Sequence, residues 1–440
     1  MRNILALGAS AIALALASTA SAQEANTVNE SADPIFTVDP AFVEDPNFGN
    51  EAVVNQTGEG NEAEVDQTES TGDGFAAVTQ GGAGDNFASV DQNGTGANRA
   101  SINQNSTTRS TSFAPAGEPE LPADRDTPDR APQAGVEQIA VITQTNDAGS
   151  LADANEAVIR QGASGVPGFD NEARITQSGA GNEAEVEQGG GSNQEDGRMF
   201  SVVAQDGSDN VAQNRQGESD YSNIEQNGEG NEAYVDQNYI TGVVGRTSDV
   251  FQGGDGNIAD VEQTASGAAS SVLQGLEGDS NNNQAFVEQA ADATSVIEQG
   301  GAGGNEARTV QQAGSAGAFA FVDQIGSMNE SLITQSAAST ANANQYGDDG
   351  DSTITQTDSG NTATLTQLDG SLNETSLIAQ GGTDGTVTVE QSGEDNFSTV
   401  TQLAGMGNEA TVTQSGMANY SSIQQSGDGN TATVTQSGGM

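Results

Sequence analysis

The sequence has 440 residues, and its 63 Asp and Glu residues face only 11 basic residues, all of them Arg, which gives a formal net charge of −52. It contains no Cys and no His, so disulfides, thiol nucleophiles, imidazole bases and thiolate or imidazole metal sites are excluded. Such an acidic surface also repels nucleic acid and anionic lipid, because phosphate binding needs clustered Lys and Arg. The acidic residues are spread evenly along the chain, which is typical of a solvent-exposed face. We therefore predict no enzyme activity, no catalytic residue, no cofactor, no metal site and no nucleic-acid partner.

Residues 1–22 are typical of a secretory signal peptide. Arg2 gives a positive start, residues 4–17 are apolar, and Ala20 to Ala22 form a small-residue cleavage site. The apolar run is shorter than the roughly 20 residues that a membrane-spanning helix needs. We expect export to the cell surface or extracellular space, a mature chain from Gln23, and no membrane insertion after cleavage.

Residues 23–49 carry three prolines ahead of the first repeat, and we predict a flexible acidic leader there. Repeats fill residues 50–104 and 136–440, with only one further proline, Pro167, in an over-long linker. Residues 105–135 hold five prolines and three Arg. We predict that this Pro-rich excursion splits the repeats into two blocks, because a strand paired on both sides tolerates no proline.

An alternating segment that ends in Gln recurs about every 11 residues, thirty times in all. Copies read GEGNEAEVDQ (Gly58–Gln67), GAGNEAEVEQ (Gly179–Gln188), GEGNEAYVDQ (Gly228–Gln237), GMGNEATVTQ (Gly405–Gln414) and GDGNTATVTQ (Gly427–Gln436). A period of two is typical of a β-strand, and the Gly-rich link between copies is typical of a turn. The sequence thus predicts about thirty short strands joined by tight turns.

The two faces of each predicted strand differ in how much they vary. Asn, Ala, Val and Gln recur on one face, whereas the other drifts among Glu, Asp, Thr, Ser and Arg. The first face must be the buried one, and a single strand cannot bury it alone. We predict an all-β fold, a β-solenoid of strand-turn-strand rungs with about 22 residues per rung, in which each rung contacts only its neighbours. Fifteen rungs would extend roughly 70 Å at about 4.8 Å per rung.

The polar ends of the inner face predict side-chain ladders. In a parallel, in-register stack each Asn or Gln amide can donate to the identical residue one rung away, which removes the penalty of burying an unpaired amide. A one-residue slip would bury acids, so the pattern also fixes register. The residues that we assign to the stacking ladder in five copies are Asn61, Ala63, Val65, Gln67, Asn182, Ala184, Val186, Gln188, Asn231, Ala233, Val235, Gln237, Asn408, Ala410, Val412, Gln414, Asn430, Ala432, Val434 and Gln436.

The unit Q-x-G-x-G-N-x-A-x-x-x-Q resembles the curlin repeat of bacterial curli fibre subunits. It occurs at Gln56–Gln67, Gln177–Gln188, Gln226–Gln237 and Gln425–Gln436, and looser copies cover nearly all of residues 50–440. The resemblance implies secretion through an outer-membrane channel, growth from a nucleator subunit, and homopolymeric amyloid-like fibres that serve adhesion and aggregation in a biofilm matrix. The chain departs from that family in its many rungs, its acidity and its Pro-rich excursion, so a fibre monomer, a nucleator and a surface adhesin all stay open.

Other interpretations compete with a fibre subunit. The first alternative is a monomeric acidic β-solenoid adhesin that needs Ca²⁺. Its best cation candidate, GDDGDS at Gly347–Ser352, lacks the spaced ligands and terminal Glu of an EF-hand, and we interpret it as a solvated turn. Ice binding would use the outward Thr rows at residues 362–366 and 431–435, although Thr is also simply a good strand residue. Disordered low-complexity sequence fits the composition but does not require strict alternation.

Overall fold

The computed structural model describes residues 51–56, 61–67, 74–82, 85–94, 96–106, 137–146, 154–162, 171–189, 199–217, 220–237, 245–275 and 282–438. The expected signal peptide, the leader and nearly all of the Pro-rich excursion lie outside these ranges. Within them the regular structure is β-strand, and none of the described residues forms a helix long and apolar enough to cross a membrane. The solenoid occupies one compact unit, residues 49–440.

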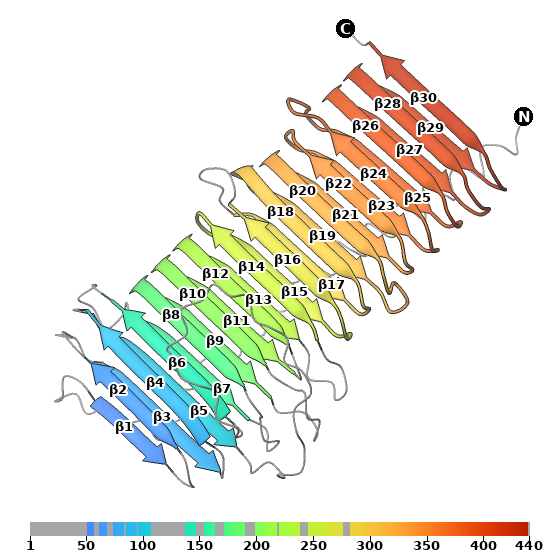
Figure 1. The fold of residues 1–440 in the computed structure, drawn as a ribbon. Coiled ribbons are helices and arrows are strands. Elements are labelled where there is room, and N and C mark those ends of the chain that lie inside the picture. Colours follow the sequence, from blue (N-terminus) through green and yellow to red (C-terminus); the bar gives the residue numbers. More distant parts are fainter. Residues whose placement is uncertain are drawn as a thin grey trace, which may run out of the picture. The chain divides into compact units, whose positions relative to one another are not determined.

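Thirty strands in the described residues form two parallel sheets of fifteen strands each (Figure 1). The odd sheet consists of β1 (Glu51–Gln56), β3 (Phe75–Gly82), β5 (Asn98–Ser106), β7 (Asn155–Gln161), β9 (Glu183–Gln188), β11 (Val211–Gln216), β13 (Glu232–Gln237), β15 (Ile258–Gln263), β17 (Gln284–Gln289), β19 (Glu306–Gln311), β21 (Glu330–Gln335), β23 (Asp351–Gln356), β25 (Thr375–Gln380), β27 (Phe397–Gln402) and β29 (Tyr420–Gln425). The even sheet consists of β2 (Glu62–Gln67), β4 (Asp85–Asn93), β6 (Glu137–Thr145), β8 (Glu172–Ala180), β10 (Phe200–Ser208), β12 (Tyr221–Glu229), β14 (Thr247–Gly253), β16 (Ala269–Gln274), β18 (Thr294–Gly303), β20 (Phe319–Ser327), β22 (Thr340–Gln345), β24 (Thr362–Gln367), β26 (Thr386–Glu394), β28 (Glu409–Met417) and β30 (Thr431–Ser437).

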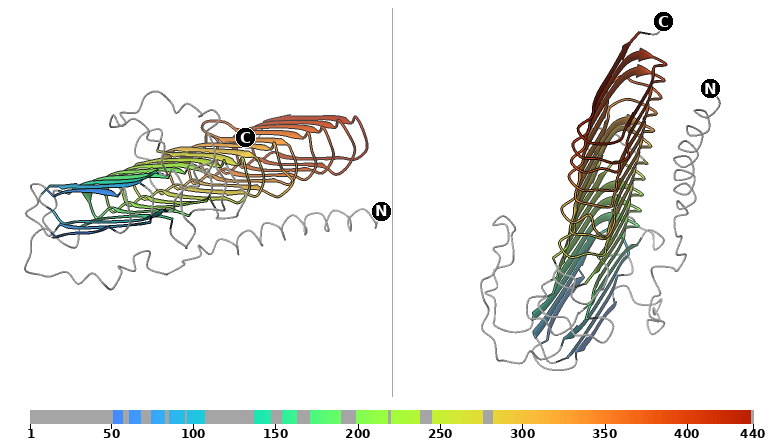
Figure 2. Two further views of the ribbon diagram at one scale, coloured as in Figure 1. Left: turned by 60° about the horizontal axis from the view of Figure 1, so that its bottom comes forward. Right: turned by 90° about the vertical axis from the view of Figure 1, so that its right-hand side faces the viewer.

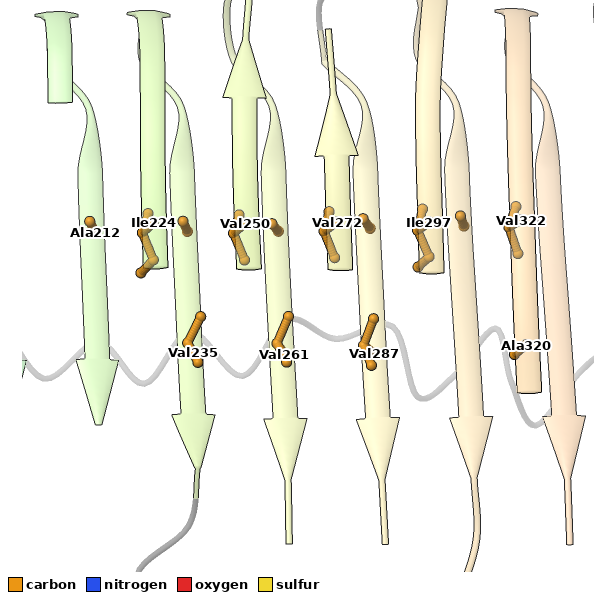
Figure 3. Packing of buried hydrophobic residues seen from close by; sticks show 14 of the residues in the cluster. Ala212, Ile224, Val235, Val250, Val261, Val272, Val287, Ile297, Ala320 and Val322 are labelled. Atoms are coloured by element: carbon orange, nitrogen blue, oxygen red, sulfur yellow. The ribbon is translucent and has the colours of Figure 1, made fainter. Parts of the chain in front are cut away.

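The chain alternates between the two sheets, so one odd strand and the even strand that follows it make one rung. Each strand is hydrogen-bonded to the strands two before and two after it in the sequence, which builds two facing layers (Figure 2). The strands of the two layers run in opposite directions because the chain reverses at every turn (Figure 3). Glycine is required where consecutive turns stack: Gly228 has φ 125°, and a Cβ there would lie 2.0 Å from the carbonyl oxygen of Gly254.

Each repeat ends in a Gln, which we call its closing Gln. The strand register places every closing Gln beside the closing Gln of the next rung. Gln205 pairs with Gln226 in the even sheet, and Gln216 pairs with Gln237 in the odd sheet. The steps here are 21 residues, and steps of 26 occur where the turns are longer, as between Gln237 and Gln263. These observations confirm the predicted all-β solenoid, with the expected 22-residue rung at the short end of the observed range.

The Pro-rich excursion does not split the solenoid, contrary to the expectation from the sequence. Strand β4 pairs with β6, and β5 pairs with β7, across the segment between Ser106 and Glu137. The two repeat blocks therefore stack in the same two sheets, and β5 runs two residues beyond the predicted end of the first block. An insertion is tolerated because the entropy cost of closing a loop grows only with the logarithm of its length.

The core is a double column of small and β-branched side chains between the sheets. Val235, Val261 and Val287 stack from one odd strand to the next, facing Val250 and Val272 of the even sheet (Figure 3). Interior members of this column are at most a few per cent exposed, whereas Val54 in the first rung is 47% exposed. Each rung thus covers the apolar face of its neighbour, and the two terminal rungs lack one cover.

Candidate functional site

Two uninterrupted glutamine ladders run the length of the solenoid, one in each sheet. In every step the Nε2 of a closing Gln donates to the Oε1 of the closing Gln in the next rung, at 2.7–3.3 Å. All these bonds point the same way, from the N-terminal rung towards the C-terminal one. The ladders therefore give the solenoid a chemical direction.

The same glutamines also join the two sheets. Gln205 Nε2 donates to Gln226 Oε1 at 2.8 Å. It also lies 3.0 Å from the main-chain oxygens of Glu183, in β9, and Asn210, just before β11. Gln161 of the odd sheet makes the corresponding contacts to the main chain of the even sheet. The side chain of a closing Gln thus reaches across the sandwich beside the turn and adds a bond to a carbonyl that already accepts a main-chain N–H, as Asn210 O accepts from Glu183 N at 2.8 Å.

Asparagine ladders run in the opposite sense. The main-chain N and the Nδ2 of Asn231 donate to Asn210 Oδ1 of the preceding rung at 3.0 and 3.1 Å, and Asn231 Nδ2 also donates to Gly254 O at 2.8 Å. Asn430 donates to Asn408 in the same manner in the last rung of the even sheet. Where consecutive rungs both carry the ladder Asn, a rung therefore donates forwards through Gln and backwards through Asn.

The structure places the sequence-assigned ladder residues on the inner face, with burial that depends on their rung. Those of the interior rungs are buried: Asn182, Ala184, Val186, Gln188, Asn231, Ala233, Val235, Gln237, Asn408, Ala410, Val412 and Gln414. Those of the terminal rungs are half-buried, apart from the last of them, which is exposed: Asn61, Ala63, Val65, Gln67, Ala432, Val434, Gln436 and Asn430.

Comparison with protein families identifies the repeat directly. The family described as Curlin associated repeat matches residues 168–195, 382–416 and 405–438. The chain carries curlin-associated repeats in these segments. The matched segments contain β8, β9 and the last rungs, β26 to β30, so the match falls on the strand-turn-strand units whose ladders are described above. No curated protein matches the chain significantly.

The even sheet carries a buried ion pair at the position that Asn occupies in other rungs. Asp220 and Arg246 stand where Asn stands in other rungs, just before β12 and β14, and both side chains are 0% exposed. The guanidinium is bidentate, with Nε 3.0 Å from Oδ1 and Nη2 2.6 Å from Oδ2, and it also donates to Gln263 O. Sequence analysis missed the pair, although each residue lies six positions before a closing Gln, as the ladder Asn does.

We expect Asp220→Ala to lower the free energy of unfolding by about 3–5 kcal/mol, because it leaves a buried guanidinium without its carboxylate. The double variant Asp220→Asn/Arg246→Asn restores an amide step and should regain most of that loss. Urea unfolding of the mature chain, followed by circular dichroism, measures both. A double variant as unstable as the single one would show that the unpaired charge is not the cause.

The outer face stacks acids wherever the register brings them together. Asp236, Glu262 and Glu288 occupy the same column in β13, β15 and β17. Burial, together with the charges of Glu288, Asp236 and Asp260, raises the pKa of Glu262 above its usual range. Arginines dilute the repulsion locally, as where Arg308 Nη2 lies 3.6 Å from Glu288 Oε2.

Acid stacks recur in other columns of the same faces. Burial and the charge of Glu156 raise the pKa of Glu183, and burial with the charges of Asp351 and Glu306 raises the pKa of Glu330. Each of these pairs is aligned across neighbouring rungs of the odd sheet. The raised pKa values therefore follow from the same register that builds the ladders.

The C-terminal rung ends in two open strand edges. Glu409 N donates to Asn430 O at 2.7 Å, and Phe397 N donates to Asn419 O at 2.8 Å, so these inner-face positions turn their main-chain groups towards the preceding rung. In a parallel ladder the groups of alternate residues point to opposite sides. The main-chain N–H and C=O groups that point away from the solenoid are consequently those of Tyr420, Ser422, Gln424, Thr431, Thr433 and Thr435.

The acidic segment GDDGDS spans the end of the turn between β22 and β23 and the first two residues of β23. Asp348 Oδ1 accepts hydrogen bonds from the main-chain N and the Oγ of Ser327, both at 2.8 Å, and thereby ties this turn to the one before it. Asp349 adopts a left-handed conformation with φ 54°. Among the described residues no group of three acids is arranged to hold a metal ion.

Proposed function

We propose that this protein is a secreted structural subunit that self-assembles end to end into curli-like amyloid fibres of an extracellular matrix. The observation that carries the proposal is the complementarity of its two ends. The last rung presents open strand edges, the last forward donors of the Gln ladders and the last acceptors of the Asn ladders. A first rung of a second copy supplies the matching groups.

At the proposed junction between two copies, the strands align in the same register as those of the interior rungs. Stacking β2 of a second copy on β30 aligns Asn61 with Asn430 and Gln67 with Gln436, and places Ala63 and Val65 on the matching apolar positions. The Nε2 of Gln436, which donates to Tyr420 O within its own rung, lies at the end of the forward ladder. Opposite ladder directions make head-to-tail addition productive, whereas two like ends would set donor against donor.

The outer faces at this junction also avoid repulsion between acids. The three outward residues of β2 are Glu62, Glu64 and Asp66, and they would lie beside the neutral Thr431, Thr433 and Thr435 of β30. A charge-neutral rung at one end thus accepts an acidic rung at the other. The arrangement favours a polar fibre in which the C-terminal rung of one copy meets the N-terminal rung of the next.

The resemblance to curli subunits supports the remaining parts of the proposal. Residues 1–22 would direct export, residues 23–49 would form a leader, and the fibre would serve adhesion and aggregation in a biofilm. A nucleator subunit and an outer-membrane secretion channel are the expected partners besides the chain itself. The role is structural, with no catalytic step.

Purified mature chain tests the proposal. We expect unbranched fibres in electron micrographs, a thioflavin-type growth curve that seeds shorten, and a diffraction spacing near 4.8 Å from aligned fibres. A chain with a β-type circular dichroism spectrum that stays monomeric at all concentrations and salt conditions would instead be the monomeric adhesin, and Ca²⁺ dependence of its surface binding would then be measured.

A further inference from the structure

A single carboxylate interrupts the asparagine ladder of the odd sheet near its C-terminal end. Glu374 occupies the ladder position just before β25 and is 1% exposed. Its main-chain oxygen accepts from Asp351 N and from Gln367 Nε2, both at 2.8 Å, as ladder asparagines do in other rungs. Its side chain therefore lies inside the sandwich, between the amides of neighbouring rungs.

The ladder has a vacancy on one side of this carboxylate. The preceding position is Gly350, whose main-chain N donates to Asn329 Oδ1 at 2.9 Å but which has no amide of its own. A side chain added there would displace ladder amides, since a Cβ on Gly350 would lie 2.4 Å from Gln367 Oε1. On the other side Asn396 Nδ2 donates to Glu374 Oε1 at 2.8 Å. The second oxygen, Oε2, is buried and has no hydrogen-bond partner.

Among the residues that the structure describes, no cation acts on Glu374. The last basic residue of the whole chain is Arg308, which lies in β19, three odd strands before β25. Strands β24 and β27 bring no titratable side chain to it. The titratable groups on β23, on β26 and in the adjoining turns are Tyr346 and acids: Asp348, Asp349, Asp351, Asp358, Asp369, Asp384, Glu390, Glu394 and Asp395. Burial raises the pKa of Glu374 to about 7, and the hydrogen bond from Asn396 acts in the opposite direction.

We propose that Glu374 is a protonation switch that controls the order of the C-terminal rungs, β25 to β30. In the neutral acid one oxygen accepts from Asn396 and the other carries a proton that it can donate, so the group has both a donor and an acceptor, like the amide it replaces. In the carboxylate both oxygens can only accept, and a charge without a counter-ion lies between two sheets. Ionisation thus places an uncompensated charge between β23 and β27, beside the gap that Gly350 leaves in the ladder.

The direction of the pH dependence follows from the raised pKa. The unfolded carboxyl titrates near 4.5 and the folded one near 7, so the folded state holds an extra proton between these values. The stabilisation by the neutral acid is complete below about pH 4.5 and is lost as the pH rises through 7. The opening equilibrium of the terminal rungs should increase roughly 50- to 100-fold between pH 5 and pH 8. In terms of the proposed function, an elongating end that is ordered at mildly acidic pH becomes loose in alkaline medium.

Hydrogen exchange of the mature chain, kept dilute and monomeric, tests the switch without relying on fibre formation. Rates corrected for intrinsic pH dependence are measured from pH 5 to pH 8 on peptides from β23 to β30, in the parent and in the variants. We expect protection in the C-terminal peptides to fall with a midpoint near pH 7. Glu374→Gln should remove this dependence, whereas Glu390→Gln, which neutralises an exposed carboxylate on β26, should retain it.

A second variant, Glu374→Asn, places the ordinary ladder residue at this position and repeats the test should Gln pack poorly. A parental profile without pH dependence, or the same dependence in the Gln and Asn variants as in the parent, would overturn the switch. Failure to form fibres under any condition would overturn the proposed function but leave the exchange result intact. The two failures are therefore distinguishable.

Discussion

A chain carrying Ser422→Pro and Thr433→Pro should fold like the parent but elongate fibres about 30-fold more slowly, or not at all. Both residues are in the last rung, and both side chains point outwards. Their N–H groups face the open edges and make no bond to the preceding rung. Proline removes these two donors and fills the edge with its ring, while the hydrogen bonds within the solenoid are unaffected. Two lost hydrogen bonds at about 1 kcal/mol each, together with the steric obstruction, give the estimated factor.

The matched control carries Ser422→Thr and Thr433→Val, which keep both N–H groups and suit a strand. Seeded growth is followed at one protein concentration for parent, control and Pro variant, after circular dichroism shows that all three are folded. The control should grow like the parent. Parental growth by the Pro variant would place the growing edge elsewhere and contradict C-terminal addition.

Acidification from pH 8 to pH 5 should stabilise the solenoid rather than weaken it, and added NaCl should do the same at pH 8. Two unit charges about 5 Å apart cost about 0.8 kcal/mol at a water-like dielectric constant. Stacked acids therefore hold folded-state pKa values above those of the unfolded chain, as at Glu183, Glu262 and Glu330. The folded state then binds more protons, so stability falls as the pH rises from about 4 through these raised values. Salt acts because it shortens the Debye length to about 8 Å at physiological ionic strength.

One substitution separates the repulsion between stacked acids from the effect of net charge. Glu262→Gln removes the middle charge of the column Asp236, Glu262 and Glu288, and should raise the free energy of unfolding at pH 8 by about 1–2 kcal/mol at low salt. The control Glu225→Gln changes an exposed acid whose cross-rung neighbours are Ala204 and Phe251. Urea unfolding at two salt concentrations measures both. Equal effects of the two substitutions would show that net charge, and not in-register stacking, sets the dependence.

Most of the fold could be predicted from the period-two pattern, because the strands, their buried face and their register all depend on the same repeated positions. It could not predict the direction of the ladders, since a repeat of identical amides is satisfied by donation either way. Nor could it show that a closing Gln reaches the opposite sheet, because that contact depends on how the two layers are staggered. The excursion was wrongly predicted to divide the solenoid because composition reports the length of an insertion and not where its ends meet.

The positions at which the asparagine ladder is interrupted could have been found from the sequence. The position six residues before a closing Gln is Asn in 18 of the 30 repeats, and the charged residues among the exceptions are Asp220, Arg246 and Glu374. Their partners follow only from knowing which strands are neighbours, since Asp220 and Arg246 are 26 residues apart. The deviations from the repeat, and not the repeat itself, thus carry the information about where the solenoid differs along its length.

The mass per unit length of the fibre tests the central claim most directly, because a chain folded into fifteen rungs advances the fibre by a fixed amount. With rungs about 4.8 Å apart, a single protofilament should contain one chain for roughly every 70 Å. Scanning transmission electron microscopy of unstained fibres gives this number. One chain per 70 Å, or a small integer multiple for paired protofilaments, is the predicted result. One chain for each 4.8 Å layer would mean that every chain lies flat in the fibre, and would contradict end-to-end stacking of folded solenoids.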